Sequence, residues 1–355
     1  MARQSSRLSA RDADMKRKRQ EAKDESSSPP VKSRRKGRKQ DVFTQDELLE
    51  GSASDASSAP HGETEGANGM KRIVTKKPTV RPAGKTPYQD ETIHPNTPTF
   101  LGELKKNNNR PWLKSHDPDF RAAERDFSSF IESTTKRLIE YDNTIPELPP
   151  KDFVRPTLTI IMRIYRDIRF SPDPTPYKPF FSAFWSRSGK KGNYSGYYVQ
   201  LDGEQCWCIG GLFAPDNALL APTREDIDRH PKRIRDVLAD KAIRSTFFAN
   251  TKESDERLET FIETNGENAL KTSPKGYASD HPDIELLRLK RFTIQRYLPI
   301  EEALGEPRAA RVAETLGCMK TLVTFLNSLV MPDEEDGDHD GEEDEDDEND
   351  EDRNE

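Results

Sequence analysis

The sequence predicts one α+β domain, a mostly antiparallel sheet packed by helices, flanked by disordered N- and C-terminal tails. Three observations predict it. Apolar residues recur at helical spacing over 118–141, strand-like alternation dominates 157–213, and helical patterns return after residue 223. Because strands cluster in the middle of the chain instead of alternating with helices, an antiparallel sheet is favoured over a doubly wound parallel one.

Charge is segregated along the chain. Of the 355 residues 34% are charged and only 32% hydrophobic, so we expect long disordered segments. We assign 1–94 to a disordered basic arm, 95–331 to the folded domain and 332–355 to a disordered acidic tail. Residues 1–40 hold 14 Lys and Arg against 5 Asp and Glu, whereas 333–355 hold 17 Asp and Glu against one Arg. Such segregation is typical of interaction arms.

The basic arm carries two clusters of Lys and Arg that are separated by residues 20–31. This arrangement is typical of a bipartite nuclear localisation signal, because an extended chain lets two acidic grooves of a nuclear import receptor each take one cluster. A compatible interpretation is contact with nucleic acid, in which basic residues release counterions. We therefore expect the protein in the nucleus. The residues of the signal are Lys16, Arg17, Lys18, Arg19, Lys32, Arg34, Arg35 and Lys36.

The acidic tail is a block of like charge that cannot collapse, so we expect it to stay extended. Three interpretations remain open: it binds histones or other basic proteins, it folds back on the basic arm, or it only aids solubility. No apolar run reaches the roughly 18 residues of a membrane span, and the N-terminus lacks the apolar stretch of a secretory signal. We therefore expect no membrane partner.

Two helices are predicted at the start of the domain. Thr97 or Thr99 can cap a short helix that carries Phe100 and Leu104. The longer helix, about 118–141, has an amphipathic stripe that we expect to lie in the core. Its members are Phe120, Ala123, Phe127, Phe130, Ile131, Thr134, Leu138 and Tyr141.

The stretch 158–170 is predicted to be a strand, because apolar and polar residues alternate along it. The more polar parity places Arg163, Asp167 and Arg169 on one face. Arg166 falls on the apolar parity, where an unpaired guanidinium is costly. Either a bulge re-aims Arg166, or a carboxylate from elsewhere pairs with it.

This arginine-rich stretch has three open interpretations. It forms a structural ion-pair network, or an anion pocket, since guanidinium groups match phosphate and carboxylate. In the third, Asp167 is the acid or base of an enzyme for a phosphorylated or nucleic-acid substrate, with the arginines as charge stabilisers. The sequence identifies no cofactor and leaves open whether the protein is an enzyme. The candidate ligand-binding residues are Arg163, Arg166, Arg169, Tyr177 and Lys178.

A hairpin is predicted next, with strands at 194–201 and 205–213 joined around Asp202 and Gly203, a dipeptide favoured in tight turns. Gly210 and Gly211 suggest a bulge or a close backbone approach within the second strand.

Three cysteines, Cys206, Cys208 and Cys318, make no disulfide framework and imply a reducing compartment. Cys206 and Cys208 face the same side of a strand. With neither a second Cys pair nor a nearby His, we expect core packing and no metal site.

Helices are predicted to complete the domain. Thr223 and Asp226 resemble a capping box at a helix start, and Pro231 is expected to kink or split that helix. A last helix over 308–330 has apolar residues at alternating four- and three-residue steps, which indicates core packing or a dimer seam. His281 is more typical of a structural histidine than of a catalytic one.

Several ordered motifs in this chain resemble those of one protein family. They are Phe100-Leu101 and Asn107-Asn108-Asn109-Arg110-x-Trp112; Arg163-x-x-Arg166-Asp167-x-Arg169-Phe170 with Asp173 and Tyr177-Lys178; Gly196-Tyr197-Tyr198 and Gly210-Gly211-Leu212; and Pro274-Lys275-Gly276-Tyr277 with His281-Pro282. They resemble the DUF2461 family over roughly 98–331. Pro174 stands where the family usually has Lys. The resemblance implies one domain and no particular reaction.

A reporter fused to residues 1–45 is expected to concentrate in nuclei, because both basic clusters are then available to an import receptor. Neutralising the Lys and Arg residues of both clusters should abolish this accumulation, as measured by fluorescence imaging. Nuclear accumulation that survives neutralisation of both clusters would contradict the localisation signal.

Overall fold

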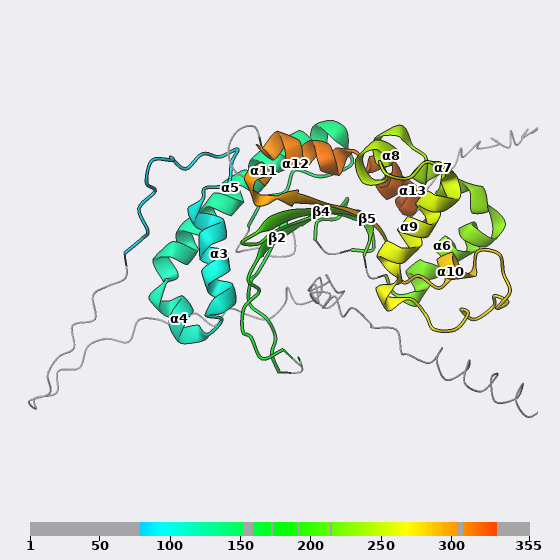
Figure 1. Ribbon diagram of the computed structural model, residues 1–355, viewed down its shortest axis with the longest axis horizontal. Coiled ribbons are helices and arrows are strands. Elements are labelled where there is room, and N and C mark those ends of the chain that lie inside the picture. Colours follow the sequence, from blue (N-terminus) through cyan, green and yellow to red (C-terminus); the bar gives the residue numbers. More distant parts are fainter. Residues whose placement is uncertain are drawn as a thin grey trace, which may run out of the picture. The chain divides into compact units, whose positions relative to one another are not determined.

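The computed structural model describes residues 79–151, 159–169, 171, 173–190, 192–213, 215–303 and 308–331 (Figure 1). The described residues form an antiparallel five-stranded sheet together with helices, so the predicted α+β class is confirmed. The predicted nuclear localisation signal and the acidic tail lie outside the described residues.

The sheet is a meander in which each strand pairs with the next one in sequence. The predicted hairpin at its centre is confirmed, with Leu201 opposite Cys206. Its turn is closed by the Asp202 carboxylate, whose Oδ1 accepts the N–H groups of Glu204 and Gln205 at 2.7 and 2.9 Å. The strands are β1 (Ile161–Met162), β2 (Phe181–Trp185), β3 (Gly196–Leu201), β4 (Gln205–Leu212) and β5 (Phe292–Pro299).

Three helices precede the sheet: α3 (Asn96–Lys106), α4 (Arg110–Ser115) and α5 (Asp117–Tyr141). The prediction of the long helix is confirmed by α5, which packs against β2. Its predicted stripe is buried except for Tyr141, the last residue of the helix, which is exposed. The predicted threonine cap of the first helix is wrong. Pro95 occupies the cap position of α3, and no side chain caps that helix.

The first helix after β4 begins earlier than predicted. Thr223 lies inside its helix, because Asp216 caps the start and accepts the N–H of Leu219 at 2.9 Å. The predicted split at Pro231 is confirmed. The helices are α6 (Asn217–Arg229), α7 (Pro231–Leu238), α8 (Lys241–Phe247), α9 (Ser254–Asn265), the 3-10 turn η2 (Gly266–Asn268), α10 (Ile284–Leu287), α11 (Ile300–Ala303), α12 (Arg308–Gly317) and α13 (Lys320–Val330).

The single helix predicted over 308–330 is two helices, α12 and α13. Packing explains the break, because α12 lies against α5 whereas α13 lies against α6 and α7, and both helices also contact β4. Met319, between the two helices, sits against Gly210 of β4, where an added Cβ would lie 2.5 Å from its sulfur. The close backbone approach predicted for Gly210 and Gly211 is found at Gly211, where an added Cβ would overlap the backbone carbonyl oxygen of Phe292 in β5.

The two faces of the sheet contribute to two separate hydrophobic clusters. The larger one joins Ala183, Val199 and Cys208 to the apolar sides of the helices. Cys206 and Cys208 are both buried in it, so their predicted packing role is confirmed. The second-face cluster consists of Met162, Phe184, Tyr198, Trp207, Ile209 and Phe213.

Three asparagine side chains pair with the backbone where regular sheet pairing stops. Asn108 donates to the carbonyl of Tyr177 at 2.7 Å and accepts its N–H at 3.1 Å. Asn327 accepts the N–H of Ser195 at 2.7 Å and donates to its carbonyl. Asn265 pairs in the same way with Thr293, at 2.9 and 3.0 Å. Each amide therefore supplies the donor and acceptor of a missing neighbouring strand.

Replacing the fully buried Asn265 by Ala is expected to lower the free energy of unfolding by about 2–4 kcal/mol, because the backbone N–H and C=O of Thr293 would lose their partners inside the protein. Urea unfolding measures the loss. Asn250→Ala, at an exposed turn, is the matched control and should change stability by less than about 0.5 kcal/mol. Equal effects of both substitutions would refute the role of Asn265.

Candidate functional site

The arginine-rich stretch is a hairpin of irregular structure. The strand predicted over 158–170 is wrong in extent, because among its described residues, 159–169, only Ile161–Met162 is regular strand. Beyond it one bridge joins Tyr165 to Tyr177, and Lys178 N–H donates to the Ile164 carbonyl at 2.7 Å. Pro174 and Pro176 lack the backbone N–H that hydrogen bonding between strands requires, which explains why the strand pairing ends early. We call residues 163–178 the arginine hairpin.

Arg166 is fixed within the hairpin by groups close in sequence. Its side chain is 14% exposed and bonds to the Asp173 carboxylate and to Thr175 Oγ1, the latter at 2.9 Å. The backbone N–H of Thr175 donates to Asp173 at 2.9 Å and is the main cause of the lowered pKa of Asp173. The sequence left two alternatives for Arg166, a bulge or a carboxylate partner. The structure shows the carboxylate partner, which is Asp173.

Asp167 and Arg169 form a second pair at the surface. The guanidinium donates to both carboxylate oxygens, at 2.5 to 3.1 Å, while the Arg169 side chain is 75% exposed. The Arg169 side chain lowers the pKa of Asp167 to about 2. A carboxylate with so low a pKa has no proton to donate near neutral pH and is a weak base, so this geometry does not favour acid–base chemistry at Asp167.

Tyr177 and Lys178 are buried, whereas Arg163, Tyr165 and Arg169 are exposed. The Tyr177 ring meets Tyr165 edge-on, with ring centres 5.5 Å apart, and burial raises its pKa. The five predicted ligand residues therefore do not converge in one open cleft. Arg163, Arg169 and Tyr165 form the accessible side of the hairpin, and Tyr165 was not among the predicted residues.

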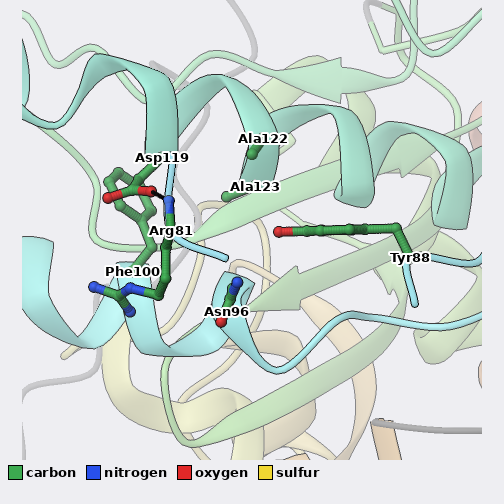
Figure 2. Close-up of a pocket in the computed structure, with 7 residues that line it drawn as sticks. All are labelled: Arg81, Tyr88, Asn96, Phe100, Asp119, Ala122 and Ala123. Carbon is green, nitrogen blue, oxygen red and sulfur yellow. Dashed lines mark hydrogen bonds between the residues drawn. The ribbon is translucent and has the colours of Figure 1, made fainter. Parts of the chain in front are cut away.

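A hollow of about 10 Å³ lies between the segment that precedes α3 and the helices α3 and α5 (Figure 2). Arg81 closes one side: its N–H donates to Asp119 at 2.7 Å, and its guanidinium binds both oxygens of Glu103 at 2.8 Å. Figure 2 shows the hydroxyl of Tyr88 pointing into the hollow. Its volume is below the roughly 300–1,000 Å³ of small-molecule sites. We interpret this contact as a strap that fastens the segment to the helices.

A buried carboxylate, Asp126 of α5, lies beneath the strap. Its Oδ2 accepts the N–H of His94 at 3.0 Å and the hydroxyl of Thr97 at 2.5 Å, while Oδ1 is buried without a hydrogen-bond partner in the described part of the chain. Burial raises the pKa of Asp126 to about 6. No sequence pattern indicated this site, because Asp126 occupies an ordinary position in an amphipathic helix.

His281 has a structural environment. Its Nδ1 accepts the N–H of Asp283 at 3.0 Å, and its Nε2 lies 3.0 Å from Asp228 of α6. Both ring nitrogens are thus engaged, which leaves none to act as a base. Asp283 also binds Arg235 of α7 at 2.5 Å. The predicted structural role of His281 therefore agrees with its contacts.

The described ranges contain neither a candidate metal cluster nor a helix that could cross a membrane. No group of three or more His, Cys, Asp or Glu residues there could hold a metal ion. No helix there is long and apolar enough to cross a membrane.

The fold and site define a class: an α+β domain on a meander sheet, with an arginine hairpin at the β1–β2 side. A family model described as a conserved hypothetical protein, DUF2461, matches residues 96–325. The match covers more than half of the chain, which therefore belongs to the DUF2461 family. Searches of curated proteins and of solved structures found no match.

Asp126→Asn is expected to remove a pH-dependent loss of stability. The folded-state pKa of Asp126, about 6, lies above its ordinary value of 3.8, so its favourable contribution is complete below pH 3.8 and disappears as the pH rises through 6. The stability of the variant relative to the natural protein should therefore rise between pH 4 and 7.5, by up to about 3 kcal/mol. Urea unfolding at several pH values measures this, and parallel pH profiles would refute it.

Proposed function

We propose that this protein is a nuclear interaction or regulatory protein whose domain binds an anionic group of a partner at the arginine hairpin. The observation that carries the proposal is the exposure of Arg163 and Arg169, together with Tyr165, on a hairpin whose described residues are joined by internal contacts. Guanidinium groups bind carboxylate and phosphate in a bidentate manner, and an exposed tyrosine adds contact area.

The contacts that fix the hairpin support this proposal. Asn108 holds the backbone of Tyr177 at its base, and Arg166 holds Asp173 and Thr175 near its tip. A preformed loop loses less conformational entropy when it binds a partner. Arg166, Tyr177 and Lys178 then position the site, whereas Arg163 and Arg169 contact the ligand.

The ion pair between Asp167 and Arg169 determines how an external anion reaches the Arg169 guanidinium. Exposed ion pairs contribute only about 0–1 kcal/mol, so an incoming carboxylate or phosphate can take the place of Asp167 on the guanidinium. Because the pKa of Asp167 is about 2, it stays negative at neutral pH and competes with every anion. This competition favours ligands that engage Arg163 and Arg169 together.

A binding role is favoured over the alternative of an enzyme with Asp167 as acid or base. The low pKa of Asp167 opposes proton transfer, and Arg166 is directed to Asp173. The nuclear setting is supported by the two basic clusters of the arm. An import receptor is thus the first partner proposed, with histones or other basic proteins for the acidic tail and nucleic acid for the basic arm.

The double variant Arg163→Ala/Arg169→Ala in the full chain is expected to bind a fluorescent oligoglutamate peptide about tenfold more weakly, because two charge-assisted contacts are lost. Fluorescence anisotropy over a range of salt concentrations measures this. The control Arg125→Ala/Arg244→Ala removes two exposed arginines elsewhere, with the same charge and the same basic arm. Equal affinities of the two double variants would refute an anion site at the hairpin.

A further inference from the structure

The second-face cluster lacks the helical cover that the other face has. Its six residues come from strands or from positions directly beside them, and no helix in the described ranges contributes to it. The rings still pack closely: Phe213 meets Phe184 and Tyr198 edge-on at 5.4 and 5.9 Å. All six side chains are at most 9% exposed. Contacts beyond those with the described helices are therefore needed to explain their burial.

Two further observations indicate that the cluster has an additional partner. The indole Nε1 of Trp207 is buried without a hydrogen-bond acceptor in the described part of the chain. A buried N–H of this kind normally has an acceptor, because leaving it unpaired is costly. In addition, Phe184, Tyr198 and Phe213 each make an interaction beyond the ring pairs given above.

We propose that residues 41–50 of the chain's own basic arm dock on the second-face cluster, with Phe43 inserted among its rings. Phe43 is the only aromatic residue in 1–78. Thr44 and Glu47 have the spacing of a capping box, and Phe43 and Leu48 have that of a hydrophobic staple, so the segment is suited to form a short helix on binding. Backbone carbonyls of the segment supply acceptors for Trp207.

Charge also distinguishes this segment from the rest of the arm. Residues 41–50 contain Asp41, Asp46, Glu47 and Glu50 and no Lys or Arg, whereas residues 1–40 are strongly basic. Met162 of the cluster directly precedes Arg163, so the arginine hairpin borders the docking surface. The acidic residues beside Phe43 are complementary to the positive charge of the arginine hairpin, whereas the basic residues 1–40 would be repelled by it.

The connection to the domain is long enough. Some 35 residues separate Phe43 from the first described residue, Thr79, and can extend to roughly 120 Å. A flexible chain of that length has a root-mean-square span of about 35 Å, which keeps the segment at an effective concentration near millimolar. Even with weak contacts, the docked state is therefore well populated.

Docking through residues 41–50 does not use the two basic clusters of the arm, because both end before Asp41. It brings acidic side chains to the border of the arginine hairpin, where an external anion would compete with them. The docking nevertheless does not depend on the proposed function, because it rests on the aromatic face of the sheet.

The test follows the three indole N–H signals of the full chain by NMR, with Trp207→Phe to assign the signal of Trp207. Phe43→Ala should shift the Trp207 signal, because the docked ring is lost. The signals of Trp112 and Trp185 should stay in place. The matched control Val31→Ala removes an apolar side chain elsewhere in the arm and should move none of the three.

A synthetic peptide of residues 38–53, added to the Phe43→Ala protein, should return the Trp207 signal toward its original position, and the same peptide carrying Phe43→Ala should not. An unchanged Trp207 signal in the Phe43→Ala protein would overturn the proposal. A Trp207 signal that moves with protein concentration would also overturn it, since a second copy would then be the occupant. Neither result bears on binding at Arg163 and Arg169.

Discussion

The structure depends on satisfying backbone groups where the sheet becomes irregular. Asn108, Asn265 and Asn327 each present an amide to the N–H and C=O of one residue, as a neighbouring strand would. Asn108 lies in a loop, Asn265 at the end of α9 and Asn327 inside α13, so the last two also tie helices to the sheet. Unpaired backbone groups in these places would cost more than most single contacts contribute. The base of the arginine hairpin is fixed in this way, by the pairing of Asn108 with the backbone of Tyr177.

The two faces of the sheet have different roles. One face joins the main core with the helices, where Cys208 and Val199 are completely buried. The other face gathers aromatic side chains in a separate cluster that borders the arginine hairpin through Met162. The positive, exposed side of the hairpin and this aromatic surface are therefore neighbours. A ligand or segment with an aromatic anchor and acidic flanks is complementary to both.

Within the hairpin, the charged residues divide into two groups by burial. Arg166 is nearly enclosed and bound to Asp173, so its contribution is to the shape of the loop. Arg169 is exposed, and its partner Asp167 remains charged over the whole physiological pH range because its pKa is about 2. A surface pair of this kind exchanges partners at little cost. These differences favour recognition of an anion over proton transfer.

The sequence by itself determined the α+β class, the long amphipathic helix and the hairpin around Asp202, because these follow from local periodicity and turn chemistry. It also identified the arginine-rich stretch. Only the tertiary structure decided the break between α12 and α13, the buried position of Asp126 and the short extent of β1, since each depends on partners distant in sequence. Alternation placed Arg163 and Arg169 on one face and Arg166 on the other, but prolines and the contact with Asn108 redirected the chain. Long-range packing, which local patterns do not encode, therefore decided the geometry of the site.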